Sequence, residues 1–418
     1  MLFARLILFA GAVALTSNAH AGPLDPPPGP VAPSGPTLLE VHDNDRLADI
    51  VDDIEQLAGA LSVHESRTDV LTLPGDALNR HIISEPGSYF LSADILVSDN
   101  DVTGVLINAD HVTLDLCGKT IMSSATGDNA ALPGPWGVYA ESGINVVVRN
   151  GNVVDFHSGQ VRINGAMGRF ESISASGGEA NAVVLTSNTS SMLIGCRVDS
   201  TENSSTGFSL SFTSYGYVIA DSHARQTSNF AFWLGNAAAV RDCSATGNTF
   251  NDAFSVSSGS VLRRCTSQNS SSGGFVSGPL GGGGSIFADC SAIDAGTNGF
   301  SVYQVLLVGC VATAAGENGY LLRSASSLYR CLALDSDDDG FLIDGPSSRV
   351  EACHAESVGA IPANYGFRAG ALGSRSFVVR NTAAGAFDTF NNGAVNASIF
   401  APDWFNVTQA GPWDNLSQ

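Results

Sequence analysis

The feature that most constrains this chain is a column of cysteines that recurs every 20 to 25 residues from Cys243 to Cys353, with one further cysteine, Cys196, two periods upstream. Apolar residues hold the position three before each cysteine, and alanine often stands two after it. A unit of this length cannot bury a core alone, so recurring apolar, thiol and small positions indicate coils stacked on one another. The column consists of Cys196, Cys243, Cys265, Cys290, Cys310, Cys331 and Cys353.

A second column keeps the same period and carries an aromatic residue that usually follows a glycine. We expect these rings to lie inside the coils, because large apolar side chains at a fixed offset fill the same interior slot in every repeat. The expected members are Phe208, Phe230, Phe254, Phe275, Phe300, Tyr320, Phe341, Phe367 and Phe387.

The residues just before the cysteines are of a different kind and include Asp242, Arg264 and Asp289. Alternation along a strand explains why the neighbours of inward cysteines face solvent. The same register places Asp221 and Asn381 in the cysteine slot of two further coils. Short β-rich runs bounded by Gly, Asn, Asp and Ser favour strand-turn-strand coils over helix pairs. The sequence therefore predicts an all-β parallel β-helix of about 13 coils.

Residues 111–121, His-Val-Thr-Leu-Asp-Leu-Cys-Gly-Lys-Thr-Ile, follow the segment Pro-Gly-Ser-Tyr-Phe-Leu at 86–91. Together with the later Gly-Phe coils, this segment resembles the first-coil motif of secreted bacterial proteins of the pectate-lyase-like superfamily. The resemblance covers roughly two thirds of the chain and implies a right-handed parallel β-helix. It says little about chemistry, because one fold hosts many functions.

The ends of the chain read as separate segments. Residues 1–21 have Arg5, an apolar run and the small-residue site Ala19-His20-Ala21, which indicates a signal peptide. A proline-rich linker is expected over 22–37. Residues 38–66 carry apolar residues at three-four spacing and predict a short helix, which either caps the solenoid or joins three copies in a coiled coil. The solenoid is expected over 67–400, and 401–418 as a C-terminal cap.

The composition of the chain limits the classes of partner that we expect it to bind. The formal net charge is −21, which disfavours nucleic acid and anionic membranes. It also disfavours polyanionic glycans unless a cation bridges them. No stretch is long and apolar enough to span a bilayer. We expect an exported protein, found outside the cell, on the cell surface or in the periplasm, and either monomeric or trimeric.

The cysteine column leaves three interpretations open. Side chains in register on parallel coils point the same way, which favours a structural ladder of buried free thiols. Adjacent positions about 4.8 Å apart also lie within the range that a disulfide permits. Metal binding is the third possibility, although the close ligand pairs typical of metal sites, such as CxxC, do not occur.

The run Asp-Ser-Asp-Asp-Asp-Gly at 335–340 matches the opening of a calcium-binding loop. Asp335, Asp337 and Asp339 would supply the carboxylates, and calcium is the one cofactor that the sequence suggests. Position 12 of such a loop would be Pro346 instead of glutamate. The alternative is an acidic turn exposed to solvent.

One polar cluster stands out as a candidate ligand site: Trp136, Arg149, Asp155, His157 and Arg162, beside a long loop over 123–136. Long loops on a solenoid often build a binding face. The tryptophan would stack on a sugar ring, while the charged groups bind its hydroxyls. Alternatively, the tryptophan fills a gap under the loop and the charges are ordinary turn residues.

Catalytic motifs of the resembling superfamily are mostly missing, and we assign no catalytic residue. The sequence favours an exported interaction or surface module that acts without catalytic chemistry and whose partner is a polysaccharide or cell-surface glycan. A carbohydrate-active enzyme, such as a polysaccharide lyase or epimerase, is the first alternative, and whether the chain is an enzyme stays open. A structural rod or adhesin subunit is the second alternative.

Overall fold

The computed structural model describes residues 67–99, 101–124, 135–178, 181–186, 190–199, 206–210, 215–278, 283–356, 358, 365–370, 376–384 and 388–392. The chain divides into two compact units, Met1–Glu65 and Ser66–Gln418, and all described residues belong to the second. The predicted signal peptide, linker, helical segment and C-terminal cap therefore lie outside the described residues.

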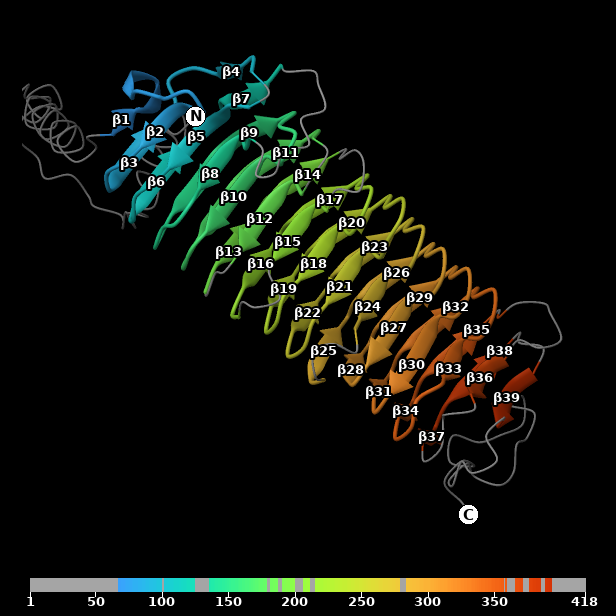
Figure 1. Cartoon of the computed structure of the whole chain (residues 1–418). Coiled ribbons are helices and arrows are strands. Elements are labelled where there is room, and N and C mark those ends of the chain that lie inside the picture. Colours follow the sequence, from blue (N-terminus) through green and yellow to red (C-terminus); the bar gives the residue numbers. More distant parts are fainter. Residues whose placement is uncertain are drawn as a thin grey trace, which may run out of the picture. The chain divides into compact units, whose positions relative to one another are not determined.

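The second unit is a stack of coils in which one sheet receives a single strand from every coil (Figure 1). We call this 14-stranded sheet the front sheet. Its strands are β2 (Asn79–Ile83), β5 (Thr103–Ile107), β8 (Val138–Ala140), β10 (Val161–Asn164), β12 (Val183–Thr186), β15 (Phe208–Leu210), β18 (Phe232–Leu234), β21 (Phe254–Val256), β24 (Phe275–Ser277), β27 (Phe300–Tyr303), β30 (Tyr320–Ser324), β33 (Phe341–Ile343), β36 (Tyr365–Ala369) and β39 (Asp388–Asn392).

The other sheet, called the back sheet, has 25 strands because most coils contribute two. Its strands are β1 (Thr68–Asp69), β3 (Gly87–Phe90), β4 (Ile95–Val97), β6 (Val112–Asp115), β7 (Thr120–Ser123), β9 (Val147–Val154), β11 (Arg169–Ser176), β13 (Met192–Ile194), β14 (Arg197–Asp199), β16 (Val218–Ala220), β17 (His223–Arg225), β19 (Ala239–Arg241), β20 (Ser244–Thr246), β22 (Val261–Arg263), β23 (Thr266–Gln268), β25 (Ser285–Ala288), β26 (Ser291–Ile293), β28 (Val305–Val308), β29 (Val311–Thr313), β31 (Ser327–Tyr329), β32 (Leu332–Leu334), β34 (Arg349–Glu351), β35 (His354–Glu356), β37 (Phe377–Val379) and β38 (Thr382–Ala384).

The strand pairing confirms the predicted parallel β-helix. Strands one coil apart pair in parallel, as β18 pairs with β21 and β19 with β22. The long strands β9 and β11 join the two ladders of the back sheet, because each pairs along both halves. Within the described residues the only helix is the 3-10 turn η1 (Val70–Thr72), and no helix is long and apolar enough to cross a bilayer.

The aromatic column forms a continuous stack of buried rings in the interior. Neighbouring ring centroids lie 4.6–5.0 Å apart, one strand spacing. One predicted member was wrong, because Phe232 occupies the slot assigned to Phe230. Phe390 pairs with Phe367 in the strand register, and the predicted member Phe387 lies outside the described residues. Alternation within β18 turns Phe232 inward, whereas Phe230 precedes the strand and stacks on Trp233. The described stack is Phe208, Phe232, Phe254, Phe275, Phe300, Tyr320, Phe341 and Phe367.

The glycine before many of these aromatics has a packing reason. A Cβ added at Gly274 would come 2.7 Å from the Cβ of Ala292, and one at Gly340 would come 2.7 Å from the Cβ of Ala355. Real Cβ atoms do not approach this closely. The alanine two after the cysteine therefore leaves no room for a side chain at the glycine of the front sheet that it faces. Two sequence columns that look independent therefore meet across the interior.

The residue before each cysteine forms the bend between the two ladders of the back sheet. All described members of this corner column have φ between 50° and 62°, in the left-handed region. They are Asn150, Ser172, Gly195, Asp221, Asp242, Arg264, Asp289, Gly309, Arg330, Ala352 and Arg380. Most are not glycine, and an L-residue in this region costs roughly 1 kcal/mol. The coil stack thus holds many unfavourable backbone conformations in place.

The corner column yields a stability prediction. Ala352 has φ 53° and, as an alanine, no side-chain hydrogen bond to lose. We expect Ala352→Gly to stabilise the protein by about 0.5 to 1 kcal/mol, because glycine adopts this conformation without strain. The midpoint of urea unfolding measures the change. Ala355→Gly, at a buried strand position of β35, is the matched control and should lower the midpoint. A lower midpoint for Ala352→Gly would contradict the argument.

Candidate functional site

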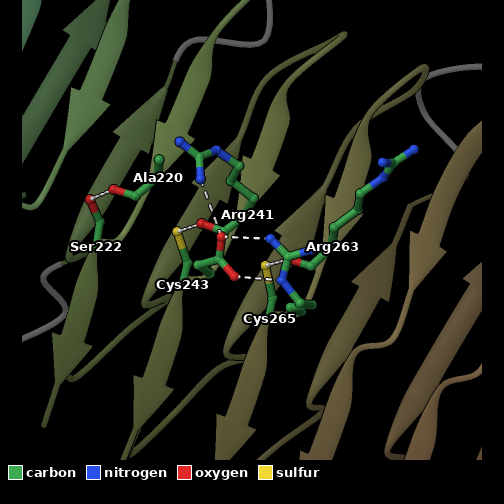
Figure 2. A network of polar contacts seen from close by, with 8 residues as sticks. Ala220, Ser222, Arg241, Cys243, Arg263 and Cys265 are labelled. Atoms are coloured by element: carbon green, nitrogen blue, oxygen red, sulfur yellow. Dashed lines mark hydrogen bonds and ion pairs between the residues drawn. The ribbon is translucent and has the colours of Figure 1, made fainter.

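The cysteine column lies buried beside the corner column, and all seven members are free thiols. Figure 2 shows the repeating contact: the Cys243 thiol donates to the carbonyl oxygen of Arg241 at 3.2 Å, and the Cys265 thiol to that of Arg263 at 3.4 Å. The remaining members make the same contact with the residue two before them, at 3.4 to 3.7 Å. Each thiol thus satisfies a carbonyl at the bend.

Two coils without cysteine fill the same slot with other hydrogen-bonding side chains. Ser222 donates to the carbonyl oxygen of Ala220 at 2.9 Å, just as the thiols do (Figure 2). The sequence register had placed Asp221 in this slot, which was wrong by one residue: Asp221 is the left-handed corner. Asn381 was placed correctly and accepts from the backbone N–H of Cys353 at 2.8 Å. In these two coils a serine and an asparagine thus supply the buried hydrogen-bonding group that the thiol supplies elsewhere, whereas two earlier coils have Gly151 and Ile173 in this slot.

Burial makes two members of the ladder, Cys196 and Cys331, unreactive. Burial raises the pKa of Cys196 to about 11, and it raises the pKa of Cys331 as well. A protonated buried thiol is a poor nucleophile and a poor metal ligand. Only Cys117, outside the ladder, is exposed.

The predicted calcium ligands do not converge. Asp335 and Asp337 are exposed, whereas Asp339 is buried with its side chain turned into the coil. Among the described residues no group of three or more His, Cys, Asp or Glu side chains is arranged to hold a metal ion. Calcium binding by this turn stays a prediction that the arrangement of the three carboxylates does not support.

Asp339 instead joins neighbouring coils. One carboxylate oxygen accepts from the backbone N–H of Tyr365 at 3.0 Å, and the other lies 3.5 Å from the guanidinium of Arg368. The two preceding coils have Asn298 and Asn318 at this position, hydrogen-bonded to each other at 2.8 Å. Burial raises the pKa of Asp339 to about 6, although the Tyr365 N–H and Arg368 oppose the shift.

The five residues of the predicted ligand cluster do not form one site. Arg149 lies on β9 of the back sheet, and its Nε is 3.0 Å from a carboxylate oxygen of Asp115. Asp115 belongs to the first-coil motif. Burial raises the pKa of its carboxyl group, but three groups more than offset this effect and bring the pKa below its usual value: the N–H of Cys117, the amide of Asn150 and the guanidinium of Arg149. Arg149 therefore serves as a structural ion pair between coils.

Asp155 and His157 follow β9 at another corner of the coil. Asp155 is exposed, has φ 62°, and its backbone N–H donates to Ser176 one coil further on at 3.0 Å. His157 is half-buried.

Trp136 and Arg162 do come together, on the outer face of the front sheet. The Arg162 guanidinium lies 5.4 Å from the ring centroid of Trp136 and 5.9 Å from that of Tyr139, and the two rings stack at 6.4 Å. Arg162 Nε also donates to Asn164 at 2.8 Å, and the Asn164 amide donates to the Tyr139 hydroxyl at 3.0 Å. The register explains the meeting, because Tyr139 on β8 pairs with Arg162 on β10.

This cluster borders a groove of about 240 Å³ that we call the aromatic groove. Trp136 is 6% exposed and therefore forms part of the groove wall, while half-buried Tyr139 presents more surface. Hydroxyl, amide and carboxylate groups share the lining with apolar side chains, as ligand sites require. The lining residues are Leu78, Asn79, Asp101, Thr103, Leu106, Pro135, Trp136, Tyr139 and Glu141.

Tyr139 and the groove carboxylates were missed by the sequence analysis. The outward position of Tyr139 follows from alternation in β8, where Val138 and Ala140 are buried. Asp101 and Glu141 are far apart in the sequence and line the same groove only because coils stack. The outward position of Tyr139 could have been predicted from strand alternation, but no local sequence pattern predicts that Asp101 and Glu141 line one groove.

No protein-family model matches the chain, and no curated protein matches it significantly. Solved structures with similarity include the tailspike receptor-binding domain of Siphovirus 9NA, at 10% identity and a TM-score of 0.42, covering 80% of this chain and 78% of that one. A mannuronan C-5 epimerase A-module from Azotobacter vinelandii has 14% identity, a TM-score of 0.36 and coverage of 69% and 90%. A pectate lyase has 12% identity, a TM-score of 0.39 and coverage of 71% and 81%. Scores this low carry no argument about function, and the fold rests on the strand pairing above.

Thiol counting tests the cysteine ladder. In the native protein we expect a thiol reagent to modify Cys117 alone, because the other seven cysteines are buried. After unfolding in denaturant without reductant, all eight cysteines should react. A shortfall of two or more thiols in the unfolded chain would instead show adjacent disulfides in the ladder.

The pH dependence of stability tests Asp339. Because its folded pKa of about 6 lies above the usual 3.8, its contribution to stability is fully present below pH 3.8 and is lost as the pH rises through 6. Asp339→Asn should continue the asparagine pair of the preceding coils and stabilise the protein by roughly 1 to 2 kcal/mol at pH 7.5, with little gain at pH 4. Urea unfolding at both pH values measures this. Asp294→Asn, at an exposed position two coils earlier, is the control. Equal gains for Asp339→Asn at both pH values would contradict the assignment.

Proposed function

We propose that this protein is an exported β-helix module that binds carbohydrate in the aromatic groove and performs no covalent chemistry. The observation that carries the proposal is the stacking of Arg162 on Trp136 and Tyr139, two residues that line this groove. Aromatic faces pack on the apolar faces of sugar rings, and a guanidinium held in one orientation binds hydroxyls with little loss of side-chain entropy.

The rigidity of the cluster supports this role. Tyr139 and Arg162 lie on adjacent paired strands, and Asn164 is hydrogen-bonded to both side chains. Thr186 on β12 adds a hydrogen bond to Asn164, so three consecutive coils hold the cluster. A site that is fixed before the ligand arrives loses less free energy on binding.

A specific observation also favours a second candidate, a glycoside hydrolase. Asp101 and Glu141 both line the aromatic groove, and hydrolysis of a glycosidic bond uses two carboxylates that flank the bond. Neither residue belongs to a catalytic motif of the superfamily that the sequence resembles. The two candidates differ in whether product appears.

A glycan array and a turnover screen of the purified full chain, with calcium and with chelator, test the proposal. We expect binding without products. Tyr139→Ala and Arg162→Ala should each weaken binding roughly tenfold, about 1.4 kcal/mol, because each removes one principal contact.

Matched controls keep the result specific. Tyr329→Ala on the back sheet and Arg323→Ala on β30 of the front sheet remove exposed residues of the same types far along the stack. Both should leave binding and the thermal midpoint unchanged. Product formation that Asp101→Asn or Glu141→Gln abolishes would replace the binding proposal with hydrolysis. If Tyr139→Ala and Arg162→Ala both leave binding unchanged, the binding site lies outside the aromatic groove.

A further inference from the structure

A second groove adjoins the aromatic groove at the first coils of the front sheet. Its volume is about 420 Å³, and Asn79, the first residue of β2, lines both grooves. Sites for small molecules usually measure about 300 to 1,000 Å³. The aromatic groove alone falls below this range, whereas the two grooves joined at Asn79 lie within it.

The shared rim carries free hydrogen-bonding groups. The Asn79 amide donates to Asp76 at 2.9 Å, and within the described residues no donor reaches its amide oxygen. Arg80 in the second groove is exposed, and its guanidinium has no hydrogen bond or ion pair in the described part of the chain, although Asp76 and Asp99 line the same groove. In the described part of the chain, an acceptor of Asn79, which lines both grooves, and the donors of Arg80, which lines the second groove, are therefore without partners.

The charges around the two grooves define the class of ligand. Four carboxylates, Asp76, Asp99, Asp101 and Glu141, line the two grooves, against the guanidinium of Arg80 in the lining and that of Arg162 stacked on Trp136 and Tyr139. A chain with a carboxylate on every sugar would place like charges near these groups, at about 1 kcal/mol for each close contact in water. An oligosaccharide without acidic groups avoids this cost.

We propose that an oligosaccharide without acidic groups binds in the aromatic groove and continues past Asn79 into the second groove, where Arg80 donates hydrogen bonds to its hydroxyls. This inference rests on the proposed function and adds the ligand's chemical class, its direction along the first coils, and two further binding residues. Ligands long enough to reach Arg80 gain affinity, whereas a disaccharide confined to the aromatic groove does not.

The test measures, by calorimetry on the full chain, the binding of gluco-, xylo-, manno- and galacto-oligosaccharides of two to six residues, with oligogalacturonates of the same lengths as acidic comparators. We expect affinity to rise with length for at least one series without acidic groups. Arg80→Ala should lower the affinity of the longer members five- to tenfold and leave the disaccharide unchanged. Arg225→Ala, an exposed arginine of the back sheet, is the matched control and should change nothing.

Each outcome decides between the two claims. If binding depends on Tyr139 but neither on length nor on Arg80, the inference is overturned and the proposed function stands. Tighter binding of oligogalacturonates overturns the assigned ligand class. Absence of binding for every oligosaccharide overturns both the inference and the proposed function. Loss of binding in Tyr139→Ala, together with a length-dependent loss in Arg80→Ala, supports both.

Discussion

Parallel pairing between consecutive coils is the interaction on which the rest of the structure depends. Because each residue stands one strand spacing above its equivalent in the previous coil, every inward position becomes a column of stacked side chains. The aromatic stack is the clearest result: planar rings fit this spacing face to face, with interplanar angles from 2° to 19°. Tyr320 continues the stack in place of phenylalanine because its hydroxyl donates to the carbonyl oxygen of Cys310 at 2.6 Å.

The corner column imposes a left-handed backbone conformation on every coil that contains it. A left-handed bend recurs at the same position in successive coils, and most coils use a residue other than glycine there. The buried thiol after the bend binds the carbonyl before it, and Ser222 does the same where cysteine is missing. At the surface of the bend, Arg264 pairs with Asp242 of the preceding coil at 2.7 Å. These contacts offset part of the backbone strain of the corner.

The candidate site lies where these constraints are weakest, on the outward side of the front sheet. Inward positions are fixed by stacking, whereas outward positions are limited only by their neighbours in adjacent coils. Tyr139, Arg162 and Asn164 use that freedom to build a cluster across β8 and β10. The sequence indicated Trp136 and Arg162 as ligand-binding residues because both residue types bind sugars. It grouped them with Arg149, which belongs to a structural ion pair on the other sheet.

The sequence by itself determined the parallel β-helix, because inward columns repeat at a fixed period and a period is visible without coordinates. It placed Asn381 and the seven cysteines correctly, but it misplaced Asp221 and Phe230, since a loop that changes length by one or two residues shifts the register without leaving a local signal. Only the tertiary structure decided which polar residues meet. Asp101, Glu141 and Arg80 have no mutual spacing that repeats, and the two grooves exist only because stacking brings separate coils together.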